Sequence, residues 1–239
     1  MQLRFNWRFA LALFALTLLL GEGHEQAHIQ FGRWACGGYG VRDFSLWAVD
    51  EACTTPSLAR LSTLAGPLFT YAVCWLGVAL LARGRSRMQR GVGLALVFAP
   101  LPFARVFTVL MGSGDEQTFL RAVLGAGPGT GLLAVLLVAL TCVPPLLIAA
   151  AELAPRRRIA WIAALCLLPM LAQGAWVRLL MNGLLARGVG ASPVIAGSPA
   201  LVVVNAALAA AALLALGRWL PSVVLVEAVS ARPEGRLSL

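Results

Sequence analysis

Long apolar runs alternate with short polar segments along the whole chain, and this pattern predicts a bundle of membrane-spanning helices. Each run approaches the ~20 residues that a helix needs to cross a bilayer. The fourth run is longer than one crossing needs and contains Pro144 and Pro145, so we expect a kink or an early end there. The predicted spans are Phe9–Arg33, Leu61–Ala82, Gly91–Gly112, Phe119–Ala151, Ile159–Leu180 and Pro199–Leu220.

The composition excludes an ordinary soluble protein. The chain has 239 residues, of which 60% are hydrophobic and 12% are charged. In soluble domains about a quarter of all residues are charged. Too little polar surface is left to face water. We therefore expect an all-α fold, a polytopic transmembrane helix bundle of about six spans. It forms a single domain over residues 1–220 and is followed by a cytoplasmic tail over residues 221–239.

The arginines predict the orientation of the bundle. The net charge of +9 includes clusters in short loops, notably Arg83–Arg87 and Arg156–Arg158. Cytoplasmic loops carry such clusters, so the charge reports topology and we expect no nucleic-acid partner. Both termini are predicted to be cytoplasmic, and the outer segments are Trp34–Arg60, Gly112–Thr118 and Gly188–Ser198. The exclusive use of arginine over lysine is typical of a high-GC genome, and we expect a multi-pass protein of a bacterial inner membrane.

The first predicted span has an alternative interpretation as a signal peptide. Arg4 and Arg8, followed by the apolar stretch Phe9–Leu20, match the basic and apolar regions of such a peptide. The residues that follow, Gly21 to His24, offer no small-x-small cleavage site. We therefore favour an uncleaved span.

The cysteines fall into two groups. Cys74, Cys142 and Cys166 lie inside apolar runs and are expected to be small buried side chains. Cys36 and Cys53 share the loop after the first span. If that loop lies outside the cytoplasm, a disulfide between these two residues is expected to be stable.

The most informative motif is His24-Glu25-Gln26-Ala27-His28, near the end of the first span. In an H-E-x-x-H helix the two histidines lie four residues apart, so both imidazoles emerge on one face. That spacing lets both coordinate one zinc ion, while the glutamate serves as general base toward water at the metal. The motif therefore predicts His24 and His28 as metal ligands and Glu25 as a catalytic residue.

Two observations favour a metal site over a structural role. His24 and His28 are the only histidines of the chain, and ionisable groups inside a span are costly and so suggest function. The alternative is an interfacial turn, in which the motif residues are simply polar positions where the helix leaves the membrane. The nearby Glu22 and Gln30 are consistent with that alternative.

A third metal ligand, usually Asp or Glu, would leave the fourth position open for water and substrate. Asp115 and Glu116 follow the third span on the side where the histidines are expected, so we favour Asp115, with Glu116 as its rival. Glu51 has a separation from the motif typical of soluble gluzincins, and Asp43 and Asp50 lie in the same loop.

Arg105 lies within the third predicted span. A buried arginine needs a counter-charge, which Asp115 or Glu116 would supply. The alternative is that the Arg105 side chain extends to the membrane interface.

With these elements in place, the sequence resembles the site-2 protease family of intramembrane zinc metalloproteases. That family carries H-E-x-x-H in one transmembrane helix, an A-G-P-x-x-N element further on and an L-D-G aspartate in a later helix. Here Ala65–Thr70 reads A-G-P-L-F-T at the start of the second span, with Thr70 in place of asparagine. Asp115 follows the third span within Gly-Asp-Glu and not Leu-Asp-Gly.

The resemblance covers the chain from about Leu18 to Glu116, within a metalloprotease-like part of about residues 9–118. It implies that Asp115 completes a zinc site. It also implies substrate-positioning roles for Gly66, Pro67 and Thr70. Taken alone, the A-G-P match equally fits a small-residue packing contact between membrane helices.

The predicted function is zinc-dependent cleavage of a transmembrane segment in another membrane protein. The implied cofactor is Zn²⁺, and the implied partners are a membrane-protein substrate and the lipid bilayer. The alternative is a non-catalytic membrane protein that binds a metal or haem or serves as a scaffold. A transporter is less well supported, because the sequence shows no internal repeat.

Overall fold

Helix α1 (Trp7–Cys36) carries the histidine motif within one continuous helix of 30 residues. It begins after Asn6, whose side chain accepts a hydrogen bond from the N–H of Arg8. It ends at Gly37, because the left-handed backbone at this position (φ 83°) favours glycine. The expected continuation of the helix through the motif is therefore confirmed.

The computed structural model describes residues 1–84 and 86–225. Helices dominate these ranges, and the predicted all-α bundle is confirmed. The elements after α1 are α2 (Pro56–Ala59), α3 (Ser62–Arg83), α4 (Arg87–Phe98), α5 (Pro102–Leu110), α6 (Asp115–Leu124), α7 (Pro128–Ala151), η1 (Pro155–Arg157), α8 (Arg158–Gly174), the π-helix η2 (Ala175–Met181), α9 (Asn182–Ala186), the hairpin strands β1 (Pro193–Ile195) and β2 (Ser198–Pro199), α10 (Ala200–Leu216) and η3 (Gly217–Val223).

Five helical segments of the described chain are long and apolar enough to cross a membrane, as expected of a multi-pass integral membrane protein. They are Pro56–Arg83, Arg87–Leu110, Pro128–Ala151, Pro155–Ala186 and Ala200–Val223. The predicted first span, Phe9–Arg33, is helical throughout but is not among these five. Its apolar stretch is interrupted by polar residues from Glu22 onward.

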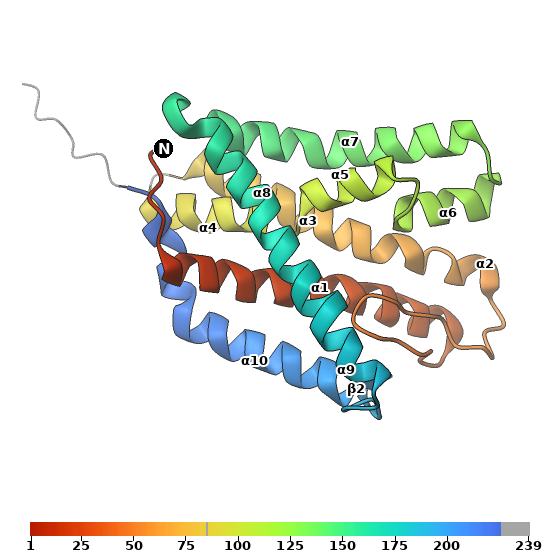
Figure 1. Ribbon diagram of the computed structural model, residues 1–239. Coiled ribbons are helices and arrows are strands. Elements are labelled where there is room, and N and C mark those ends of the chain that lie inside the picture. Colours follow the sequence, from red (N-terminus) through yellow and green to blue (C-terminus); the bar gives the residue numbers. More distant parts are fainter. Residues whose placement is uncertain (85, 226–239) are drawn as a thin grey trace, which may run out of the picture.

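Helix α1 packs against other helices on several sides (Figure 1). Figure 1 shows α1 between α3 and α10, with α8 crossing it at a steep angle, and α1 contacts all three. Helix α6 packs on α3 and α7. Because α3 contacts both α1 and α6, it links the histidine motif to the acidic residues at the start of α6.

The predicted fourth span, Phe119–Ala151, is two helices and not one. Helix α6 ends at Leu124, and Gly125 follows with a left-handed backbone (φ 85°). Helix α7 then begins at Pro128. Proline is tolerated there because backbone N–H groups in the first turn of a helix have no partner within the helix. Glycine and proline together separate the two helices.

The prolines inside α7 and at the start of α5 differ in their effect on the helices. Helix α7 continues past Pro144 and Pro145 to Ala151, so the helix does not end early, and the alternative expectation of a kink stays a prediction. In contrast, Pro102 opens α5, and the left-handed backbone of Leu101 before it (φ 56°) interrupts the helical path. The predicted third span, Gly91–Gly112, is therefore split into α4 and α5.

The start of the predicted tail packs against the N-terminal segment. The N–H of Arg4 donates to the carbonyl oxygen of Val223 at 2.8 Å, and Leu3 pairs with Val224. Residues 226–239 of the predicted tail, and Arg85 of the first arginine cluster, lie outside the described residues.

Candidate metal centre

Two imidazole nitrogens converge on one face of α1. The Nε2 atoms of His24 and His28 lie 3.1 Å apart, and the rings meet edge to face. His28 is only 1% exposed. A paired arrangement in which His28 is buried and His24 is mostly covered argues against the alternative of an interfacial turn, in which both rings would face water or headgroups.

Asp115 brings a third donor atom to the same point. It is the first residue of α6, and its Oδ2 atom lies 3.2 Å from Nε2 of His24 and 3.7 Å from Nε2 of His28. The centre of this triangle lies about 2 Å from each atom, which is the length of zinc–nitrogen and zinc–oxygen bonds. Two histidines and one carboxylate, with a fourth position open, are a typical donor set of a catalytic zinc site.

The second nitrogen of each ring is held by α3, which fixes the direction of Nε2. His28 Nδ1 lies 2.7 Å from the carbonyl oxygen of Ser62, which only accepts, so Nδ1 carries the proton. His24 Nδ1 lies 2.8 Å from the hydroxyl oxygen of Thr70, which can accept a hydrogen bond from Nδ1–H in the same way. Both Nε2 lone pairs then face the Asp115 carboxylate. Three acceptors in contact require a cation or added protons between them.

Gly66 leaves the space in which the donor atoms meet. A Cβ atom at this position would lie 2.2 Å from Nε2 of His28 and 2.7 Å from Nε2 of His24. Any side chain would therefore collide with the Nε2 atoms of both histidines. The residues present thus fit a bound metal ion.

Arg105 separates the roles of the two adjacent carboxylates. Its Nη2 atom donates to Oδ2 of Asp115 at 3.0 Å and to Oε1 of Glu116 at 2.7 Å, so the expected counter-charge is confirmed. Glu116 is 2% exposed and also accepts a hydrogen bond from the hydroxyl of Tyr71. Glu116, the predicted rival ligand, is therefore directed into this ion-pair network and away from the histidines.

The surroundings of Asp115 keep its carboxylate ionised. Burial raises the pKa of this carboxyl. When Nε2 of His24 and His28 is protonated, the hydrogen bonds that these atoms donate to Asp115, together with the charge of Arg105, outweigh that effect. The pKa therefore lies well below its usual range. The ionised form is the one that binds a metal ion.

Glu25 lies on the wall of a large cavity beside the centre. The cavity has a volume of about 650 Å³, and His24, Glu25 and Asp115 line it together with residues of α8 and η2 such as Gln173 and Arg178. Across residues 1–84 and 86–225, no protein group hydrogen-bonds to the Glu25 carboxylate. Because Glu25 also lines the cavity, a water molecule or a substrate there can reach its carboxylate.

The other acidic candidates lie apart from the triad. Asp43 accepts hydrogen bonds from the N–H groups of Ser45 and Leu46, and Asp50 accepts one from its own turn. Glu51 is an exposed residue of the same loop. Short acidic side chains in turns satisfy nearby N–H groups in this way. Within the described chain, the group that could hold a metal ion is His24, His28 and Asp115.

The A-G-P-L-F-T element of α3 lies directly behind the histidines. Gly66 leaves space at Nε2 of both rings, Thr70 contacts His24, and Pro67 is buried in the helix. Thr70 also lines the cavity. The substrate-positioning roles that the resemblance implies for these residues stay a prediction.

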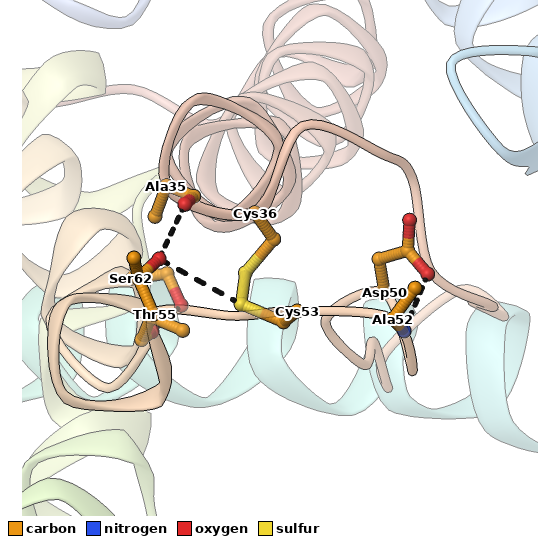
Figure 2. The surroundings of a disulfide bond; sticks show 8 residues. Ala35, Cys36, Asp50, Ala52, Cys53, Thr55 and Ser62 are labelled. Atoms are coloured by element: carbon orange, nitrogen blue, oxygen red, sulfur yellow. Dashed lines mark hydrogen bonds between the residues drawn. A yellow bond between two sulfur atoms is a disulfide. The ribbon is translucent and has the colours of Figure 1, made fainter.

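In the loop after α1, the sequence suggested only acidic residues as candidate ligands and gave Trp47 no part in the site. In the structure the ring of Trp47 stacks on His28, with 4.8 Å between centroids and 16° between planes. The one available signal was the cysteine pair. Cys36 and Cys53 are joined by a disulfide, which returns the loop to the end of α1 (Figure 2). No motif spacing predicts which residue inside such a loop meets the motif.

Comparisons with protein-family models, with curated proteins and with solved structures give no match for this chain.

Proposed function

We propose that this protein is a zinc-dependent intramembrane metalloprotease that cleaves a transmembrane segment of another membrane protein. The observation that carries the proposal is the meeting of His24 Nε2, His28 Nε2 and Asp115 Oδ2 at one point. Glu25, next to the first histidine, lines the cavity at that point. This combination of three donors and an unpaired carboxylate is what metal-assisted hydrolysis of a peptide bond requires.

His24, His28 and Asp115 would hold the ion. Zinc is the metal we propose, because imidazole and carboxylate ligands with one open position are typical of catalytic zinc. When bound, zinc polarises a carbonyl oxygen and lowers the pKa of water at its open position.

The protein's own groups perform the proton transfer and hold the ligands. Glu25 takes a proton from the attacking water and delivers it to the leaving nitrogen as the peptide C–N bond breaks. Ser62 and Thr70 keep the imidazoles in place through their Nδ1 atoms. Arg105 holds the Asp115 carboxylate through the hydrogen bond to Oδ2.

The position of the cavity suggests the class of substrate. Much of its lining comes from segments apolar enough to cross a membrane, so a peptide that reaches Glu25 enters from the bilayer or its surface. A helical peptide bond is covered by its own backbone, and the substrate must therefore unwind. Gln173 and Asn205 on the cavity wall are suited to hydrogen bonds with an unwound backbone.

We place the protein in a bacterial inner membrane with both termini in the cytoplasm. The loop between Cys36 and Cys53 is then on the outer side. Its disulfide supports this orientation, because disulfides persist in oxidising compartments.

The test combines zinc content with peptide cleavage. Wild type purified without chelator should carry about one zinc per chain, as a single tetrahedral site requires, and the His24→Ala/His28→Ala variant should carry none. Glu25→Gln should keep zinc but lose cleavage of transmembrane peptides in proteoliposomes, followed by mass spectrometry. A wild type that takes up no zinc contradicts the proposal. If Glu25→Gln keeps its cellular activity with zinc bound, the non-catalytic metal-binding alternative is correct.

A further inference from the structure

A loop closed by a disulfide lies directly against the ligand His28. The Trp47 ring covers one face of the His28 imidazole, with 4.8 Å between centroids and 16° between planes. Trp47 also packs on α1, since a Cβ atom on Gly32 would lie 3.7 Å from its Cζ3 atom. The His28 ring is thus held by Trp47 on its face and by Ser62 at Nδ1.

Two further contacts anchor the same loop near the motif. Both terminal nitrogens of Arg42 donate to the carboxylate of Glu22, at 2.9 and 3.0 Å, and the Arg42 side chain is 1% exposed. Glu22 lies on α1 two residues before His24. Phe44 is buried in an apolar cluster that includes Leu18. The loop is therefore part of the packed structure around the histidines.

The disulfide fixes both ends of this loop. Cys36 is the last residue of α1, and Cys53 lies shortly before α2 (Figure 2). Thr55 adds a hydrogen bond from its hydroxyl to the carbonyl oxygen of Ala35. The disulfide reduces the number of conformations in which the loop lies away from α1. It therefore favours the conformation in which Trp47 stacks on His28.

We infer that Trp47 is a positioning residue for the metal ligand His28, and that the Cys36–Cys53 disulfide holds it there, so that opening the disulfide weakens zinc binding. The inference rests on the metal centre of the proposed function and does not depend on proteolysis. Groups that orient a ligand histidine typically change metal affinity by about 10–100-fold. We expect a loss of about 10-fold or more when the disulfide opens.

The disulfide is opened with a water-soluble phosphine. The sulfur–sulfur bond breaks, and phosphorus supplies two electrons and takes the oxygen of a water molecule to become a phosphine oxide. The two hydrogens of that water end on the Cys36 and Cys53 thiols. Both cysteines are partly exposed, whereas Cys74, Cys142 and Cys166 are buried free thiols.

The experiment measures zinc affinity of the full chain in detergent, before and after phosphine treatment. Reduced wild type should bind zinc about 10-fold more weakly than oxidised wild type. Cys36→Ser/Cys53→Ser should bind as reduced wild type does and should not respond to phosphine. That variant has an open loop but no thiols at positions 36 and 53, and it needs no phosphine. A weaker zinc affinity in it therefore comes from loop opening and not from zinc bound by new thiols or by the phosphine. Because wild type is reduced after it has folded, this comparison does not depend on the folding of a variant. The helical circular dichroism of wild type should be the same before and after reduction.

Variants of Trp47 test the stacked ring itself. Trp47→Phe keeps an aromatic face and should bind zinc within about 3-fold of wild type, whereas Trp47→Leu should lose about as much as reduction. Trp34→Leu is the matched control, because Trp34 is 70% exposed on the same helix as the motif. Cobalt binding should quench tryptophan fluorescence more in wild type than in Trp47→Phe, because the Trp47 ring stacks on the ligand His28. The zinc affinity retained by Trp47→Phe and lost by Trp47→Leu is the result that separates a positioning role from a purely structural one.

Equal zinc affinity of oxidised and reduced wild type overturns the inference and leaves the proposed function intact, and so does a Trp47→Leu variant that binds as wild type does. Suppose that zinc binding depends on the disulfide but the Glu25→Gln variant stays active. The proposed proteolysis is then contradicted, and the inference about Trp47 and the disulfide is supported. A wild type that binds zinc in neither state overturns both.

Discussion

Oδ2 of Asp115 lies 3.2 Å from Nε2 of His24, although 91 residues separate the two in the sequence. Their helices meet through a third element, since α3 packs on both α1 and α6. The same helix supplies the Nδ1 partners of both histidines. The geometry of the candidate centre therefore depends on α3 as much as on the motif.

Asp115→Asn removes the anionic donor while keeping the size of the side chain. We expect zinc affinity to fall by more than ~100-fold, beyond the usual effect of groups that only orient a ligand. The measurement is competition with a chromophoric zinc chelator. Asp50→Asn, in a turn of the loop after α1, is the control and should bind zinc as wild type does. Comparable zinc binding by both variants would exclude Asp115 as a ligand.

Gly66→Ala places a methyl group where the donor atoms meet. Its Cβ atom would lie 2.2 Å from Nε2 of His28, so the imidazole must move. We expect zinc content to drop below half, because a ligand histidine has to keep its orientation. Gly183→Ala in α9 is the control, since a Cβ atom there has open space. Full zinc occupancy in purified Gly66→Ala would contradict the conclusion that a side chain at position 66 displaces the histidines.

Thr70→Val replaces the hydroxyl beside His24 Nδ1 with a methyl group of similar shape. The His24 ring loses the partner that sets its tautomer, and we expect zinc binding about 10–100-fold weaker. Thr70→Ser keeps the hydroxyl and should remain close to wild type. Isothermal titration of both variants decides the matter, and equal loss in the two would point to packing instead of the hydrogen bond.

Arg105→Met leaves Glu116 buried without its cation. Removing one partner of a buried ion pair costs about 3–5 kcal/mol, and we expect a loss of this size in the free energy of unfolding in mixed micelles. Arg105→Met/Glu116→Gln should recover part of that loss, because the buried residue 116 then carries no charge and only Asp115 lacks the Arg105 cation. Arg121→Met, at an exposed position of α6, is the surface control. An Arg105→Met protein as stable as wild type would show that the ion pair contributes little.

The helical class and the histidine pair follow from the sequence alone. A chain with so few charged residues places its apolar runs in lipid, where backbone groups must be hydrogen-bonded within each helix. Two residues four positions apart share a face of any α-helix, whatever packs against it. The need of Arg105 for a carboxylate partner follows from burial of charge alone.

The choice between Asp115 and Glu116 was decided only by the tertiary structure. Adjacent residues of a helix point about 100° apart, so the rotation of α6 on α3 selects which carboxylate faces the histidines. The stacking of Trp47 on His28 and the hydrogen bond of Thr70 to His24 depend on packing in the same way. Local periodicity determines which face a residue occupies, but side-chain packing across the bundle determines what that face meets.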